Sequence, residues 1–255
     1  MTTELKLETG IWYGRTEVID SYFTSPLKLG IPAAFGERRK IVLMMASAGI
    51  LKGDTFDYHI RCGAGTKNLL TEQSYTKIFD TGEGGAERRQ NIEVLEGASL
   101  YYRPCLVIPF KGSRFDGWTQ VCLAADSEFA YGDIMAGGRV GMGECFLFSH
   151  YRNRVWVTVE GKPVWMDHCL LEPENMSLEN LVFFDGFTHQ GTFYYYGPKE
   201  KQEQLFSYRP ENKEIRYGVS GAVKGIGIRI LAGCAQDIER IFEEIEEKIG
   251  LRNEE

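Results

Sequence analysis

The chain has 255 residues, which is long enough to bury a substantial hydrophobic core without the disulfides or metal ions that short scaffolds need. Its 29 glycines, its 13 % of aromatic residues and its 8 prolines suit many short strands joined by tight turns. The formal net charge of −7 argues against a nucleic-acid partner, because phosphate binding depends on clustered Lys and Arg.

Alternation of apolar and polar residues predicts strands through most of the chain. In TFDYHIRC, residues 55–62, every second residue from Phe56 to Cys62 is apolar, which is typical of a strand with one buried face. In VWVTVEGKPVWM, residues 155–166, two alternating runs flank a Glu160-Gly161 turn and predict a hairpin. We therefore expect a β body over about residues 5–232.

The C-terminal stretch AQDIERIFEEIEEKIG has a different period. Its large apolar residues recur at helical spacing and form one stripe, opposite a face rich in glutamate: Ile238, Ile241, Phe242, Ile245 and Ile249. This pattern predicts a helix over about residues 235–249. No Pro/Ser-rich linker or low-complexity tract divides the chain, so we expect one mainly β domain over residues 1–255, with this helix at its end.

The stretch ASAGILKGD, residues 46–54, could be a phosphate loop, a metal site or a bend between strands. A phosphate loop of the G-x-x-x-x-G-K-[ST] type needs a lysine directly after its second glycine and a helix behind it. Here Lys52 precedes Gly53, and the stretch runs into the strand predicted from Thr55. A bend between two strands, allowed by its glycines, is the interpretation that we favour.

Cysteine and histidine spacing argues against a nucleophilic or tight metal site. The 6 cysteines include no C-x-x-C pair, and the N-terminal stretch MTTELKLETG is predominantly polar and does not read as a signal peptide, so we expect reduced thiols in a cytoplasmic protein. The 4 histidines form no H-x-H and no Cys/His pairs at the spacing of zinc ligands, because the adjacent His168 and Cys169 point to opposite faces of a strand, and no G-x-S-x-G turn is present. No apolar run approaches the roughly 18 residues that span a bilayer, so we expect no membrane partner.

Several carboxylates follow or lie between glycine turns. Asp54 and Glu144 suit turn-forming or solvated positions, whereas Asp133 and Asp167 lie inside predicted strands with aromatic and aliphatic neighbours. A carboxylate enclosed there needs a partner, a water path or a passing cation. These two aspartates are therefore the acids that most need a functional explanation.

The order of five segments is distinctive. They are SAGILKGD from Ser47, LTEQSYTKIF from Leu70, EGASLYYRPCLVIPF from Glu96, AGGRVGMGECFLF from Ala136 and FDGFTH from Phe184. In this order and at these separations they resemble the urease accessory proteins of the UreD type, also called UreH. The resemblance runs from about Trp12 to the C-terminal helix.

This resemblance implies a mainly β, irregular, β-helix-like stack of strands with a C-terminal helix or helix pair. It also implies a protein that is not an enzyme and that binds apo-urease and a UreF-type accessory protein, which recruits the UreG-type GTPase that delivers nickel. A proposed family property is an internal passage for nickel. No tightly bound cofactor is implied, only transient nickel.

The resemblance also assigns residues of this chain to family motifs by position. The assigned residues are Ser47, Gly49, Gly53 and Asp54 in the first motif, Thr71, Gln73, Ser74 and Lys77 in the second, and Arg139 and Glu144 in the G-R-x-x-x-x-E element. Asp133 stands where members commonly have an acid shortly before that arginine. Lys52 stands where members often have a small residue, so the shape of the bend can differ.

We select Asp54, Asp133 and Asp167 as contacts for transient nickel, with Ser74 as a hydroxyl ligand. Isolated oxygen ligands suit conduction, because an ion that is bound weakly is released easily, whereas Cys/His clusters hold nickel tightly. Two alternatives stay open from the sequence. One is a β-sandwich or barrel enzyme that uses an Asp/Glu pair on a small substrate or sugar, and the other is an adaptor without any metal passage.

Overall fold

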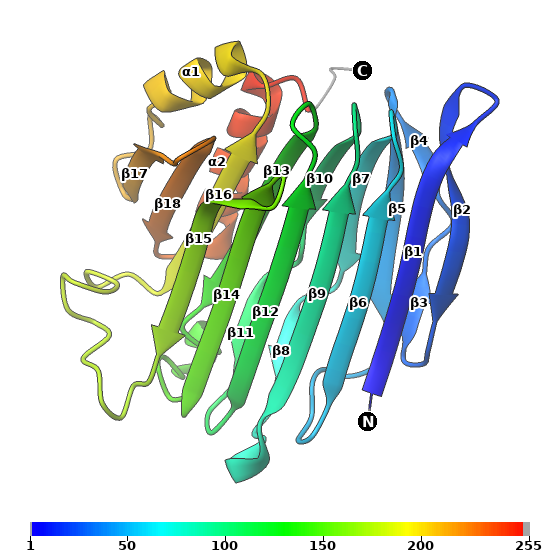
Figure 1. The fold of residues 1–255 in the computed structure, drawn as a ribbon. Helices are drawn as coiled ribbons and strands as arrows, with labels where there is room; N and C mark the ends of the chain where they lie inside the picture. The colour runs from blue at the N-terminus through cyan, green and yellow to red at the C-terminus, as the bar shows by residue number, and fades with distance from the viewer. Residues whose placement is uncertain (1, 252–255) are drawn as a thin grey trace.

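The computed structural model describes residues 2–251 and has two β-sheets that face each other, with two helices beside the second sheet (Figure 1). The first sheet has the strand order β15 (Lys162–Leu171), β14 (His150–Val159), β12 (Arg114–Leu123), β9 (Ala86–Val94), β6 (Thr55–Cys62), β1 (Thr2–Trp12) and β2 (Arg15–Phe23). Three strands predicted from alternation lie in this sheet: β6 and both strands of the hairpin β14–β15.

The second sheet has the order β17 (Arg216–Gly221), β18 (Ile226–Ala232), β16 (His189–Tyr196), β13 (Glu128–Ala136), β10 (Ser99–Arg103), β7 (Lys67–Gln73), β5 (Arg38–Met45) and β3 (Leu27–Leu29). Three short strands join it beside this path: β4 (Ala33–Phe35), β8 (Thr76–Ile78) and β11 (Val107–Pro109). Single 3₁₀ turns occur at Gly82–Gly84 and Val140–Met142.

From β5 to β14 the chain crosses repeatedly between the two sheets, so that strands adjacent in a sheet are parallel and far apart in sequence. In the first sheet β6, β9, β12 and β14 pair in parallel, and in the second sheet β5, β7, β10 and β13 do the same. Each crossing adds a layer to a coil of strands. The expected β-helix-like stack is therefore confirmed (Figure 1).

Side chains on alternate positions of the second sheet enter two different cores. On β13, Tyr131 and Met135 belong to the apolar cluster between the sheets, whereas Ala130 and Ile134 belong to a second cluster on the other face. Helix α2 (Ala235–Lys248) covers that other face and contacts β13, β16 and β18. It begins where its apolar stripe predicts.

Helix α1 (Lys199–Ser207) lies inside the range that the sequence assigns to the β body, and this part of the prediction is wrong. Its sequence, KEKQEQLFS, consists largely of good helix formers but has no apolar stripe, because only Leu205 is buried. A helix without such a stripe leaves no hydrophobic period to detect. Among the described residues, neither helix has the length and apolar character needed to cross a membrane.

Candidate functional site

The stretch at residues 46–54 connects β5 of the second sheet to β6 of the first. Gly49 has φ +155°, and a Cβ atom there would lie 2.5 Å from the carbonyl oxygen of Lys77, so a larger residue does not fit. Gly53 has φ +76° and its N–H donates to the carbonyl of Gly85 at 2.8 Å. Because the stretch runs into a strand that begins at Thr55, it is a corner between sheets and lacks the following helix of a phosphate loop.

This corner forms one wall of a pocket that reaches inward between the sheets, where Leu43 of the second sheet and Phe56 and Tyr58 of the first line it. Five of the motif residues line it: Ser47, Gly49, Gln73, Ser74 and Lys77. Ser74 is exposed and has φ +74°, directly after β7 ends. At the inner end of the pocket lie Glu72 and Arg88, which are also lining residues.

Asp54 lies at the end of the same corner, and its carboxylate accepts the N–H of Leu51 at 2.9 Å. Its side chain therefore closes the turn in which it lies. The two predicted nickel contacts Asp54 and Ser74 thus belong to the corner and the pocket, where β6 begins and β7 ends.

Strand register places four polar residues in one row on the inner face of the second sheet. Asp133 pairs with Thr192 on β16, and Thr192 pairs with Arg229 on β18. In the other direction, Tyr102 of β10 pairs with Leu70 of β7 on one side and with Tyr131 of β13 on the other. Because these strands are parallel, Glu72, two residues after Leu70, is level with Asp133, two residues after Tyr131. The row crosses the strands and so follows the long axis of the coil.

Polar side chains of the first sheet meet this row across the interior. Asn153 donates to Asp133 Oδ2 at 3.0 Å, and Arg88 Nη1 lies 3.5 Å from Glu72 Oε1. Gln90 donates to Thr119 Oγ1 at 3.0 Å. We call the whole set the polar band: Glu72, Arg88, Gln90, Tyr102, Thr119, Asp133, Asn153, Asp167, Thr192 and Arg229.

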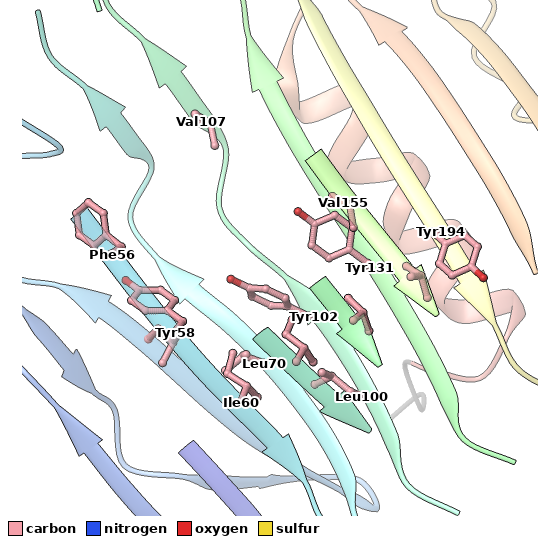
Figure 2. Packing of buried hydrophobic residues seen from close by; sticks show 14 of the residues in the cluster. Phe56, Tyr58, Ile60, Leu70, Leu100, Tyr102, Val107, Tyr131, Val155 and Tyr194 are labelled. Atoms are coloured by element: carbon pink, nitrogen blue, oxygen red, sulfur yellow. The ribbon is translucent and has the colours of Figure 1, made fainter. Parts of the chain in front are cut away.

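The polar band passes through a largely apolar interior. Figure 2 shows Tyr58, Tyr102 and Tyr131 among aliphatic side chains, with their hydroxyl oxygens directed to the same side. The Tyr102 hydroxyl lies 2.8 Å from Glu72 Oε1 and 2.9 Å from Gln90 Oε1. Buried polar groups need such partners. The band accordingly consists of three bonded groups: Glu72, Arg88, Gln90, Tyr102 and Thr119; Asp133 and Asn153; and Asp167, Thr192 and Arg229.

Asp133 is the residue of the polar band with an unsatisfied hydrogen-bond acceptor. Its Oδ1 atom is shielded from solvent and has no hydrogen-bond partner among the residues that the structure describes. Burial, and next the neighbouring Asp167 carboxylate, raise the pKa of Asp133 to about 7. Near neutral pH this carboxyl group is therefore divided between its protonated and charged forms.

Asp167 has a strong partner of its own. It forms an ion pair with Arg229, whose Nη1 atom also donates to Thr192 Oγ1 at 2.9 Å. The structure thus brings together two of the predicted nickel contacts, Asp133 and Asp167, on facing sheets. Between residues 2 and 251 no three His, Cys, Asp or Glu side chains are grouped so that they could hold one metal ion.

Three further motif residues lie outside the polar band. Thr71 faces away from the interior and lines a pocket next to α2 with Tyr101. Arg139 and Glu144 form an ion pair in the loop after β13, and the Arg139 guanidinium lies 4.5 Å from the ring centre of Phe110. These contacts hold the loop in shape and do not reach the band.

Sequence reasoning missed most of the polar band, although one signal was available. In AERRQNIEV, residues 86–94, Arg88 and Gln90 are in phase with Ile92 and Val94, so alternation alone places both on the buried face. The same phase argument places Glu72 with the buried Leu70. No sequence pattern pairs Arg229 with Asp167, because that contact joins two sheets.

Comparison with known proteins gives a consistent family. The family model described as UreD urease accessory protein matches residues 1–254. The chain is 33 % identical to a urease accessory protein UreH of Helicobacter hepaticus, over 89 % of this chain and 90 % of that protein. It is 32 % identical to a urease accessory protein UreD of Acetivibrio thermocellus, over 90 % of each chain. With its coil of strands and its ordered motifs, the chain belongs to the UreD family of urease accessory proteins.

Proposed function

We propose that this protein is a non-catalytic, cytoplasmic scaffold of urease maturation that conducts nickel through its interior. It binds apo-urease and a UreF-type accessory protein, and through the latter a UreG-type GTPase. Its family membership supports the role in urease maturation. The polar band supports the conduction of nickel, which is cargo here and not a resident cofactor.

The observation that carries the passage is the row of polar side chains across the core, with one carboxylate oxygen of Asp133 left without a partner. A divalent ion needs oxygen ligands or water to replace its hydration shell in an apolar interior. Conduction further requires that each contact be weak and that several follow in series. Spaced carboxylates, amides and hydroxyls meet both needs better than a tight cluster.

The residues of the passage have different tasks in this proposal. Ser74 and the corner with Asp54 receive the ion at the pocket, whose inner end reaches the Glu72–Arg88 pair. Asp133 and Asp167 then supply the negative charge that compensates for lost hydration. Because the pKa of Asp133 is raised to about 7, a fraction of the protein molecules carries a protonated Asp133 near neutral pH. In these molecules Asp133 must release its proton as the ion arrives.

Asp133→Asn tests the passage, because it removes the charge and keeps the size and the hydrogen bond with Asn153. We expect at least a fivefold slower rate of nickel incorporation into urease, measured by mass spectrometry of metal content, with unchanged co-purification of the partner proteins. Asp57→Asn is the matched control, since Asp57 is about half exposed and pairs with His59 on the outer face of β6. Equal rates for the two variants would show that Asp133 has no part in transfer.

The two alternatives give different results in simple assays. An adaptor without a passage predicts that Asp133→Asn loads urease like the wild type. An enzyme that uses Asp133 and Asp167 as acid and base predicts turnover by the isolated protein, which the scaffold does not show. The family name, urease accessory protein, favours the scaffold over the enzyme.

A further inference from the structure

The polar band ends at the side of the molecule where β15 and β18 approach each other. β15 is the edge strand of the first sheet, and β18 lies next to the edge strand β17 of the second (Figure 1). Arg229 extends from β18 to Asp167 of β15, so this ion pair joins the two sheets at their edge. The side chain of Arg229 is 40 % exposed, whereas that of Asp167 is only 12 % exposed. The pair therefore stands between solvent and the interior.

Aromatic, thiol and carboxyl side chains surround the Arg229–Asp167 pair on its inner side. On the inner face of β15, Trp165 stacks on Tyr194 of β16 with ring centres 4.5 Å apart and seals one side. On the other side is Cys169, whose sulfur lies 3.8 Å from the side-chain amide of Gln190. Asp133 lies beside Thr192 in the strand register, and Thr192 accepts a hydrogen bond from the same Arg229 that pairs with Asp167. Removal of the Arg229 guanidinium would therefore expose a carboxylate pair and a thiol.

Arg229 has room to move away. Its strand neighbour on β17 is Gly218, and a Cβ atom built there would meet no other atom within 4 Å. The side chain is already partly in solvent, where an arginine is well hydrated without a partner. Asp167 is mostly buried and needs a cation beside it at all times. Because Arg229 can be hydrated alone and Asp167 cannot, Arg229 leaves more easily when another cation takes its place beside Asp167 than when Asp167 is left unpaired.

We propose that Arg229 is a gate: its guanidinium closes the polar band at the β15–β18 edge, and a divalent cation that reaches Asp133 and Asp167 displaces it and leaves there. The gate rests on the proposed nickel passage, because it assigns one opening of that passage. Arg229 acts by competing for Asp167 and is a positioning residue, which need not contact the ion. Salt weakens its hold, as for any partly exposed ion pair.

Nickel binding to the purified protein tests the competition. We expect Arg229→Gln to bind one Ni²⁺ with a Kd at least tenfold lower than the wild type, measured by equilibrium dialysis, because the competing cation is gone. Arg229→Lys, which keeps the charge, should restore weak binding, and Asp167→Asn combined with Arg229→Gln should abolish the gain. Arg216→Gln is the control, because Arg216 lies on the neighbouring strand β17, pairs with Asp185 of the loop before β16 and is 60 % exposed. Equal Kd values for Arg229→Gln and Arg216→Gln would overturn the gate.

Thiol accessibility tests the closure by a second route. Cys169 should react with N-ethylmaleimide at least five times faster in Arg229→Gln than in the wild type, as measured by mass spectrometry of its peptide. Cys62, which is 1 % exposed in the core, reports on unfolding, since its labelling rises only if the whole protein opens. An unchanged ratio of Cys169 to Cys62 labelling would refute the closure.

The two proposals can fail separately. If Asp133→Asn slows urease loading while Arg229→Gln behaves like Arg216→Gln in both assays, the passage stands and the gate is wrong. If Arg229→Gln gains nickel affinity and Cys169 labelling while Asp133→Asn loads urease normally, the exchange at Asp167 stands and conduction through the band is wrong.

Discussion

Single residues in this protein are constrained by the backbone as strongly as by the core. Gly49 and Gly53 belong to the same corner and both have positive φ angles, yet only Gly49 is also crowded, by the Lys77 carbonyl and the Phe79 ring. At Gly53 a Cβ atom would meet nothing within 4 Å. A substitution at Gly53 therefore adds backbone strain alone, whereas a substitution at Gly49 adds backbone strain and steric overlap.

We expect Gly49→Ala to lower the free energy of unfolding by roughly 3 kcal/mol, because overpacking adds to backbone strain. Gly53→Ala should cost only about 1 kcal/mol, since strain acts there alone. Urea denaturation of both variants measures the difference. Equal losses would mean that the corner relaxes away from Lys77 and that its shape is not fixed by that contact.

Asp133 gives the protein a pH-dependent stability. Because its pKa rises from 3.8 to about 7 on folding, the folded state holds the proton more tightly than the unfolded state, and stability falls as pH rises through this interval. Asp133→Asn removes this effect. Its stability relative to the wild type should therefore increase by roughly 2 to 3 kcal/mol between pH 5 and pH 8. A relative stability that is flat over this range would contradict a buried, proton-binding Asp133.

At the scale of elements, α2 holds its position through one apolar face. Ile238 is fully buried and lies against Gly191 of β16, where the lack of a side chain lets the helix approach the sheet. Ile238→Ala should lower the free energy of unfolding by about 2 to 5 kcal/mol through the cavity that it leaves. The control Glu247→Ala, on the exposed face, should change it by less than about 0.5 kcal/mol. Thermal unfolding followed by circular dichroism gives both values, and similar losses would contradict this docking of α2.

Elements with a strong hydrophobic period were predictable from the sequence, and others were not. β6 and α2 each show one clear period, of two residues and of 3.6 residues, because each buries one face. Helix α1 has no such face and was missed. The pairing of β6 with β9 and of β9 with β12 could not be predicted either, since these parallel neighbours are joined only through strands of the other sheet.

At the scale of the whole molecule, the candidate site results from register between strands that are distant in sequence. The sequence singles out Asp133 and Asp167 as enclosed acids, and the structure places them on facing sheets. The sequence alone does not indicate that Glu72 and Arg229 stand in the same row as Asp133. That alignment depends on the pairing of β7, β10, β13, β16 and β18. A motif list therefore finds the corner and the pocket, whereas the polar band requires the fold.

The central claim is that nickel travels inside this protein, and competition with a chelator in the surrounding solution tests it most directly. Urease would be loaded by the purified complex of this chain with its UreF- and UreG-type partners in the presence of excess EDTA, and its nickel content followed over time. The claim predicts that loading by the wild type persists, because the ion never enters the bulk solution, and that loading by Asp133→Asn falls at least fivefold. Loading that the chelator abolishes for the wild type, or that Asp133→Asn supports at the wild-type rate, would contradict it.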